Sequence, residues 1–139
     1  MKMQSRPIDV FFYGLFMDPD MLRAKGLHPM NGRQARVSGM ALRIGRRATL
    51  VPDPNKTVYG FVFGLPHQEI DQLYQEPSVA MYRPEAVITR LSDQSCIPAL
   101  CFNLPPSSEP EDANPEYAEK LRAVAGRLGL PADYIATIR

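Results

Sequence analysis

Residues 8–22 read Ile-Asp-Val-Phe-Phe-Tyr-Gly-Leu-Phe-Met-Asp-Pro-Asp-Met-Leu, and this stretch decides the fold. Ile8 to Tyr13 is a run of β-branched and aromatic residues that stops at Gly14, which predicts a buried strand. Asp18 is typical of a helix N-cap, with Pro19 at the first helical position. We therefore expect a strand that enters a short helix through a compact loop.

The rest of the chain divides into further predicted strands and helices. Alternating or continuous apolar runs predict strands at 34–44, 48–51, 57–65, 82–91 and 96–104. Apolar spacing after proline or a cap predicts helices at 66–75, 114–128 and 131–138. Composition predicts a turn at Pro52–Asn55 and an exposed loop at 105–113. Since strands occur in runs, we expect one α+β domain over residues 1–139, with a mostly antiparallel sheet or small barrel.

Composition excludes several classes of function. The 139 residues carry a formal net charge of +1, which gives no electrostatic reason to expect nucleic acid or an anionic membrane as partner. No apolar run approaches the ~18 residues of a membrane span, and residues 1–7 lack a signal-peptide pattern, so we expect a cytoplasmic protein. Cys96 and Cys101 are five apart on one predicted strand and point to opposite faces, which argues against a mutual disulfide.

The residues alone leave two candidate functional features. His28 and His67 are isolated and give no metal-ligand spacing, so we expect no metal site. The Tyr13-Gly14 loop is either a plain turn or a place where backbone N–H groups face an anionic ligand. Glu76, after the second predicted helix, is either a solvated carboxylate or a partly desolvated one suited to proton transfer.

Three stretches, in this order, resemble the gamma-glutamyl cyclotransferase-like family over about residues 8 to 104. Residues 11–22 resemble its opening, a hydrophobic strand followed by a Tyr-Gly-Ser/Thr-Leu loop and a short helix. Residues 58–65 resemble its Val-x-Gly-x-hydrophobic-Tyr strand. Residues 70–76, followed by Tyr82-Arg83, resemble its Leu-Asp-x-hydrophobic-Glu-Gly segment and a later Tyr-x-Arg-type strand start.

The resemblance implies a small mixed, mostly antiparallel β-barrel with flanking helices and a pocket at the Tyr-Gly loop. It also implies cyclotransfer on a γ-glutamyl amine, amide or peptide, which releases 5-oxoproline without a cofactor. In this reading Glu76 is the general acid/base. The residues that would bind the substrate are Tyr13, Gly14, Leu15, Phe16 and Tyr82.

Two departures from the family pattern keep alternatives open. Leu15 stands where the family has a hydroxyl residue, so a side-chain hydrogen bond to the substrate is lost while backbone donors remain. Gln75 and Glu76 both compete for the glutamate position, and the spacing to Tyr82 does not decide between them. The alternative function is a catalytically silent relative that binds a small metabolite or a partner protein in the same pocket.

Overall fold

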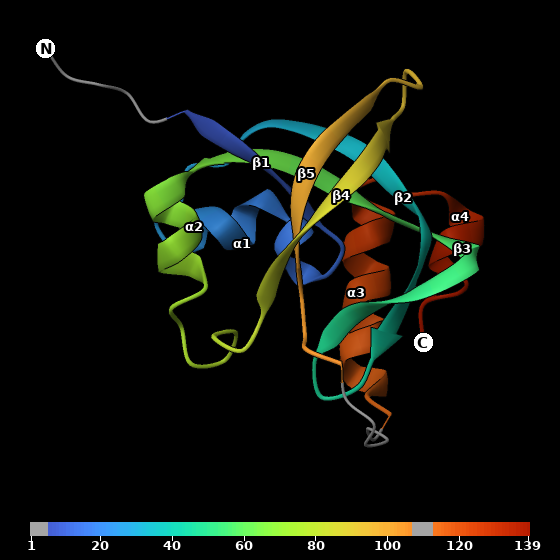
Figure 1. The fold of residues 1–139 in the computed structure, drawn as a ribbon. Coiled ribbons are helices and arrows are strands. Elements are labelled where there is room, and N and C mark those ends of the chain that lie inside the picture. The colour runs from blue at the N-terminus through green and yellow to red at the C-terminus, as the bar shows by residue number, and fades with distance from the viewer. Residues whose placement is uncertain (1–5, 107–112) are drawn as a thin grey trace, which may run out of the picture.

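The computed structural model describes residues 6–106 and 113–139. Its elements in chain order are β1 (Pro7–Phe12), the 3-10 helix η1 (Leu15–Met17), α1 (Pro19–Ala24), β2 (Met30–Ile44), β3 (Ala48–Pro66), α2 (His67–Leu73), β4 (Arg83–Leu91), β5 (Cys96–Asn103), α3 (Pro115–Arg127) and α4 (Ala132–Ile135). The strands close into a barrel in the order β1-β3-β2-β4-β5 (Figure 1). Among the strands of the described residues, the β1–β5 pairing, which joins the two edges of the sheet, is parallel, and the β1–β3, β2–β3, β2–β4 and β4–β5 pairings are antiparallel. The predicted mixed, mostly antiparallel α+β barrel is confirmed.

The strand, loop and helix predicted from residues 8–22 form as β1, η1 and α1. The side chain of Asp18 accepts a hydrogen bond from the backbone N–H of Asp20 at 3.0 Å and so caps α1, with Pro19 at its start. Gly26, two residues beyond α1, has a φ of +83°, a left-handed conformation that glycine adopts without strain. Local sequence therefore explains this whole segment.

The predicted turn at Pro52–Asn55 is wrong. Residues 48–66 form one strand, β3, which pairs with β2 on both sides of that segment. The segment rich in proline and asparagine coincides with a β-bulge within the strand. Ser38 pairs with Thr57 while Met40 pairs with Pro52, so extra residues of β3 lie outside the ladder. Prolines that cannot donate to a ladder are accommodated at such bulges.

Gly60 in β3 lies where the backbones of two strands approach each other closely. A Cβ atom at this position would lie 2.2 Å from the carbonyl oxygen of Phe12 on the neighbouring strand. The space between β1 and β3 is therefore available only to glycine. Around this contact the core is formed by residues such as Phe11, Val58 and Val62, which are almost fully buried.

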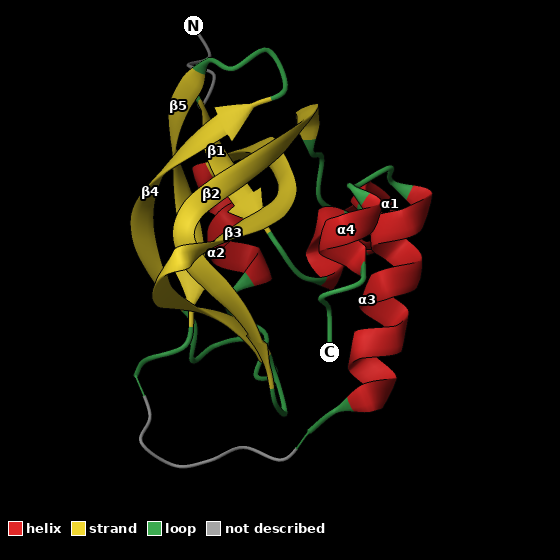
Figure 2. Ribbon diagram, turned by 90° about the vertical axis from the view of Figure 1, so that its right-hand side faces the viewer, coloured by secondary structure: helices red, strands yellow, loops and turns green. Residues whose placement is uncertain are grey.

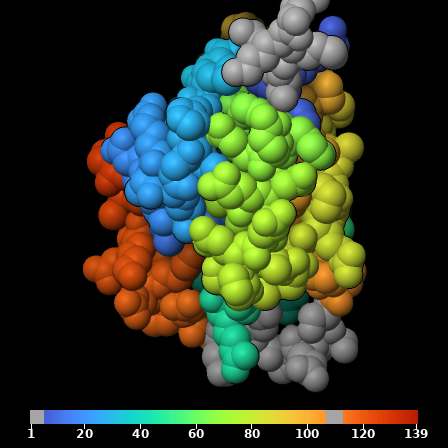
Figure 3. Space-filling view, turned by 90° about the vertical axis from the view of Figure 1, so that its left-hand side faces the viewer, coloured from blue at the N-terminus to red at the C-terminus, as the bar shows by residue number. Residues whose placement is uncertain are grey.

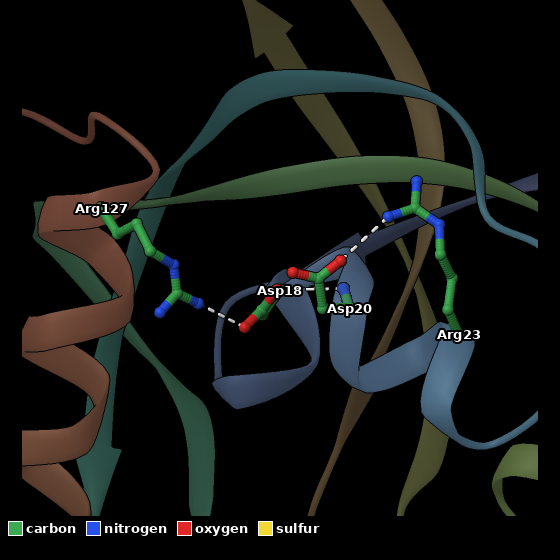
Figure 4. Close-up of polar contacts among 4 residues, drawn as sticks. All are labelled: Asp18, Asp20, Arg23 and Arg127. Carbon is green, nitrogen blue, oxygen red and sulfur yellow. Dashed lines mark hydrogen bonds and ion pairs between the residues drawn. The ribbon is translucent and has the colours of Figure 1, made fainter.

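The helices flank the barrel. α1, α3 and α4 lie together on one side, as Figure 2 shows, and α2 follows directly from β3. Asn114 caps α3 by accepting a hydrogen bond from the N–H of Tyr117 at 3.1 Å, as its sequence predicts. Arg127 near the other end of α3 forms an ion pair with Asp18, which joins this helix to the start of α1 (Figure 4). Arg23 and Asp20 form a second ion pair with a nitrogen–oxygen distance of 3.1 Å, which is drawn in the same figure.

Two segments with a sequence prediction lie partly outside the described residues. Most of the predicted loop at 105–113 falls on residues 107–112, which lie outside the described residues, as do residues 1–5 of the N-terminal segment. In the described ranges, the helices are too short or too polar to cross a membrane. The helix predicted at 66–75 ends at Leu73, so Glu76 lies beyond it, in a turn.

Candidate functional site

One cavity of about 190 Å³ contains all of the residues predicted to bind the substrate. Its lining residues are Phe11, Phe12, Tyr13, Gly14, Leu15, Phe16, Met21, Arg46, Arg47, Ala48, Tyr74, Val79, Tyr82, Phe102 and Tyr117. A second cavity of about 210 Å³, near Leu104 and Pro105, contains none of the predicted residues. The volume of the first cavity is below the ~300 Å³ of pockets for drug-sized ligands and suits a small metabolite.

The barrel topology explains why these distant residues meet. β1 and β5 are parallel, so Phe12 and Phe102 both lie near the carboxyl ends of their strands, at the same end of the barrel. The turn between β2 and β3 brings Arg46 and Arg47 to that end, and Tyr82 directly precedes β4. The loop after β1 then covers this end of the barrel. The barrel therefore provides the floor of the cavity, and loops and helices provide its walls.

Aromatic rings form most of the wall. Tyr74 stacks on Phe102 with ring centroids 3.9 Å apart, and Tyr82 lies against Tyr74 at 6.2 Å. The Tyr13 hydroxyl donates to the carbonyl oxygen of Phe102 at 2.7 Å, and the Tyr82 hydroxyl donates to that of Ala48. Hydroxyls held by backbone carbonyls fix the rings in place, so this wall is preformed.

Burial decides the chemistry of these phenols. Burial raises the pKa of Tyr13 and of Tyr74 far above the ordinary value, and the nearby Cys101 raises both further. Both side chains are therefore neutral at physiological pH and are hydrogen-bond donors rather than bases. The thiol of Cys101 is itself buried, and burial raises its pKa to about 12, which excludes it as a nucleophile.

The charged residues of the lining are all cations. Arg46 and Arg47 belong to the turn between β2 and β3, and no Asp or Glu belongs to the described lining. Arg47 is half-buried, and its Nε donates to the backbone carbonyl of Ser78 at 2.8 Å, which anchors the guanidinium at the wall. An apolar cavity with arginine at its wall is complementary to a small molecule that carries a carboxylate or another anionic group.

The Tyr-Gly loop contacts a residue that the sequence did not indicate as functional. The backbone N–H of Leu15 donates to the hydroxyl of Tyr117, on α3, at 3.3 Å. A Cβ atom on Gly14 would lie 2.7 Å from the same hydroxyl oxygen. The apolar periodicity of α3 predicts that Tyr117 faces inward, but it does not predict that this inward side meets a cavity.

Glu76, the predicted acid/base, lies beside the cavity and is not part of its lining. Its two carboxylate oxygens accept hydrogen bonds from the Lys25 ammonium group at 2.9 and 3.0 Å. Its backbone carbonyl accepts from the N–H of Val79 at 3.0 Å, and Val79 does line the cavity. The segments that contain Lys25 and Glu76, around α1 and α2, are neighbours on the face of the molecule shown in Figure 3.

The family pattern offers a further assignment at this position. Counting forward from Ile70 along Leu-Asp-x-hydrophobic-Glu-Gly places Tyr74, and not Gln75 or Glu76, at the glutamate. Tyr74 lines the cavity, whereas Gln75 is exposed and outside it. The spacing in the sequence alone allows this alignment. The structure shows that the residue at this position, Tyr74, is an aromatic residue of the cavity wall.

The histidines have partners outside the cavity. Nδ1 of His28 lies 2.9 Å from Glu69, and Nε2 of His67 lies 3.3 Å from Asp71. Across residues 6–106 and 113–139, no cluster of three or more His, Cys, Asp or Glu side chains could hold a metal ion.

The comparisons with known proteins agree with this architecture. A family model described as gamma-glutamyl cyclotransferase, AIG2-like, matches residues 10–121. None of the curated proteins matches the sequence. Because the family model spans the loop, the barrel strands and the start of α3, the match includes every lining residue of the cavity.

Solved structures of the same fold are similar at low sequence identity. A structure titled gamma-glutamyl cyclotransferase has a TM-score of 0.78 and 19% identity, over 96% of this chain and 88% of that one. The human uncharacterized protein loc79017 gives the same values. YkqA from Bacillus subtilis has a TM-score of 0.75 and 24% identity, over 94% of this chain and 52% of that one. The chain belongs to the gamma-glutamyl cyclotransferase, AIG2-like family.

Proposed function

We propose that this chain is a cyclotransferase that acts on a γ-glutamyl amine, amide or peptide. The α-amino nitrogen of the substrate attacks its own γ-carbonyl carbon, a new C–N bond closes the five-membered ring, and the original γ-amide C–N bond breaks. The products are 5-oxoproline and the free amine or amino acid. The observation that carries the proposal is that Tyr13–Phe16 and Tyr82 line one small cavity, in a chain that belongs to this family.

The cavity supplies the positioning that this reaction needs. Ring closure is intramolecular, so holding the γ-glutamyl chain in a bent conformation provides much of the rate acceleration. Rings fixed by hydrogen bonds to the barrel, such as those of Tyr13 and Tyr82, provide a rigid surface against which the chain bends. Arg47 is suited to the anionic end of the substrate.

Glu76 carries the proton in the proposed reaction. It takes a proton from the α-ammonium group and later delivers one to the leaving nitrogen. To do so it must exchange Lys25 for the substrate ammonium. The side chains of Lys25 and Glu76 are 29% and 39% exposed, and ion pairs at such positions are worth only about 0–1 kcal/mol, so the exchange costs little.

A second candidate function is favoured by one specific observation. The described lining of the cavity has no carboxylate, and Tyr74 stands at the wall where one count of the family pattern has a glutamate. A protein with that arrangement would bind a γ-glutamyl compound or a similar small metabolite without turning it over. The two candidates share the cavity and differ in whether Glu76 reaches the ligand.

Direct product analysis tests the proposal. The purified chain is incubated with γ-glutamyl amines, γ-glutamyl amino acids and a γ-glutamyl isopeptide, and 5-oxoproline is measured by mass spectrometry. We expect product from at least one compound, and loss of that product with Glu76→Gln. Glu116→Gln is the matched control because Glu116 is exposed on α3. Ligand binding without product from any compound would leave the second candidate.

A further inference from the structure

We infer that Tyr117 is a ligand-binding residue whose hydroxyl donates a hydrogen bond to the substrate oxygen held at the Tyr-Gly loop. The inference rests on the proposed function for the identity of the ligand. It adds to the site a residue from α3, about a hundred positions away from the loop in sequence.

Tyr117 is held in position at its backbone and at its hydroxyl. Its backbone N–H is held by the Asn114 side chain at 3.1 Å in the first turn of α3, and the next residue, Ala118, is buried against the core. Its ring lines the cavity, and its hydroxyl meets the backbone of Gly14 and Leu15. The hydroxyl is thus placed by a rigid helix at the edge of the loop.

The direction of its hydrogen bond leaves the proton of Tyr117 available. The hydroxyl oxygen accepts from the N–H of Leu15, so it is an acceptor in this contact. Among the hydrogen bonds of the described residues, none has the Tyr117 hydroxyl as donor. Tyr13 and Tyr82, by contrast, use their protons on backbone carbonyls. A hydroxyl that accepts from one N–H is polarised and becomes a better donor to a third group.

The loop needs such a donor. Its residues 14–17 are Gly, Leu, Phe and Met, none of which carries a side-chain hydrogen-bond donor. The N–H of Leu15 is already directed at Tyr117, so the phenol extends this backbone donor into the cavity. Burial raises the pKa of Tyr117, which keeps the hydroxyl protonated at physiological pH and able to donate.

The test compares two tyrosine-to-phenylalanine variants. Tyr117→Phe removes the hydroxyl and keeps the ring. Tyr134→Phe is the matched control, because Tyr134 is buried in α4 against Tyr59 and lies outside the cavity. We measure kcat and KM with the γ-glutamyl compound that gives most 5-oxoproline, and its Kd by calorimetry. Circular dichroism at the assay temperature gives the folded fraction, and every value is expressed per folded molecule.

We expect Tyr117→Phe to lower kcat/KM by roughly 10–100-fold, the effect of losing one donor at a developing or full negative charge. Tyr134→Phe should stay within about twofold of the wild type. If the wild-type chain binds the compound without turnover, the same inference predicts a Kd raised by roughly fivefold or more in Tyr117→Phe alone. An unchanged kcat/KM or Kd in Tyr117→Phe, with an active or ligand-binding wild type, would overturn the inference and leave the proposed function standing. A wild type that neither turns over nor binds any γ-glutamyl compound overturns both.

Discussion

The ammonium group of Lys25 lies 2.9 and 3.0 Å from the two carboxylate oxygens of Glu76, so one cation contacts both oxygens of the proposed acid/base. The same ammonium lies 5.7 Å from the centre of the Phe16 ring, a residue that lines the cavity. In the proposed reaction the substrate ammonium needs the same carboxylate. In that reaction Lys25 and the substrate ammonium group therefore compete for the Glu76 carboxylate, at the edge of the cavity.

Replacing Lys25 by methionine should release this carboxylate. We expect kcat/KM for 5-oxoproline formation to rise by up to about fivefold, which corresponds to ~1 kcal/mol, the upper value for an exposed ion pair. The free energy of unfolding should change by less than about 1 kcal/mol. Lys120→Met, which removes a more exposed pair with Glu116, is the control. A fall in kcat/KM would show instead that Lys25 holds Glu76 in its working position.

Replacing Gly14 by alanine tests the contact between the loop and α3. The new Cβ would lie 2.7 Å from the Tyr117 hydroxyl oxygen, so the loop or the ring must move. We expect the free energy of unfolding, measured in urea, to fall by about 1–3 kcal/mol. The double variant with Tyr117→Phe should recover most of this loss, because the clashing atom is gone.

A matched glycine in α3 provides the reference. A Cβ on Gly126 would meet no heavy atom within 4 Å, so Gly126→Ala should stabilise the chain by about 0.5–1 kcal/mol. Additive effects of Gly14→Ala and Tyr117→Phe would contradict the proposed contact.

Replacing Arg47 by methionine should change which ligands bind. We expect the Kd of a γ-glutamyl amino acid to rise by about tenfold, since an arginine–carboxylate hydrogen bond is lost in a mostly apolar cavity. The matched γ-glutamyl amine, which lacks the second carboxylate, should be affected less. Arg43→Met is the control because Arg43 is exposed and outside this cavity. Equal losses for both ligands would place the α-carboxylate, common to both, at Arg47.

The two cysteines should differ in reactivity with a thiol reagent. Cys96 is exposed, whereas Cys101 is buried and its pKa is raised to about 12. At pH 8 the buried Cys101 thiol therefore stays protonated, and the thiolate is the reactive form. Native protein should therefore release one equivalent of chromophore from Ellman's reagent quickly, and two after denaturation. Rapid reaction of both thiols in the native protein would contradict the buried position of Cys101.

Alkaline pH should destabilise the fold. Burial raises the pKa of Tyr13, Tyr74 and Tyr117 above the ordinary value of 10.0, and that of Tyr134 to about 12. Above pH 10 the unfolded chain loses these phenol protons while the folded chain keeps them, so the free energy of unfolding falls as pH rises. We expect it to be nearly constant between pH 7 and 8, and to begin to fall near pH 9, where the Cys101 thiol of the unfolded chain ionises while the buried thiol stays protonated. Above pH 10 it should fall by up to about 1.4 kcal/mol per pH unit for each such tyrosine. Urea unfolding at successive pH values measures this slope.

Local signals predicted much of the fold. The caps at Asp18 and Asn114 each act through neighbouring residues, so the sequence is sufficient to place them. The prediction of a turn at Pro52–Asn55 was wrong because β3 pairs with β2 on both sides of this segment. That pairing is a long-range property, and it overrides the local preference of proline and asparagine for turns.

The site was less predictable than the fold for the same reason. The order of three motifs indicated Tyr13–Phe16 and Tyr82, which line the cavity. Tyr117 and Arg47 reach the same cavity only through the packing of α3 and the closure of the barrel, which no spacing in the sequence encodes. Whether Glu76 acts as the acid/base stays a prediction, because its carboxylate faces Lys25.

The ion pair between Arg127 and Asp18 and the hydrogen bond from Leu15 to Tyr117 join the loop at the cavity to α3, which lies near the end of the chain. The residues that close the barrel, from β1 to β5, all precede α3 in the chain. During synthesis the barrel strands therefore leave the ribosome before the wall that completes the cavity. The nascent chain therefore has the barrel and most of the cavity lining before Tyr117 is in place, and we expect the cavity to be complete only when α3 has docked.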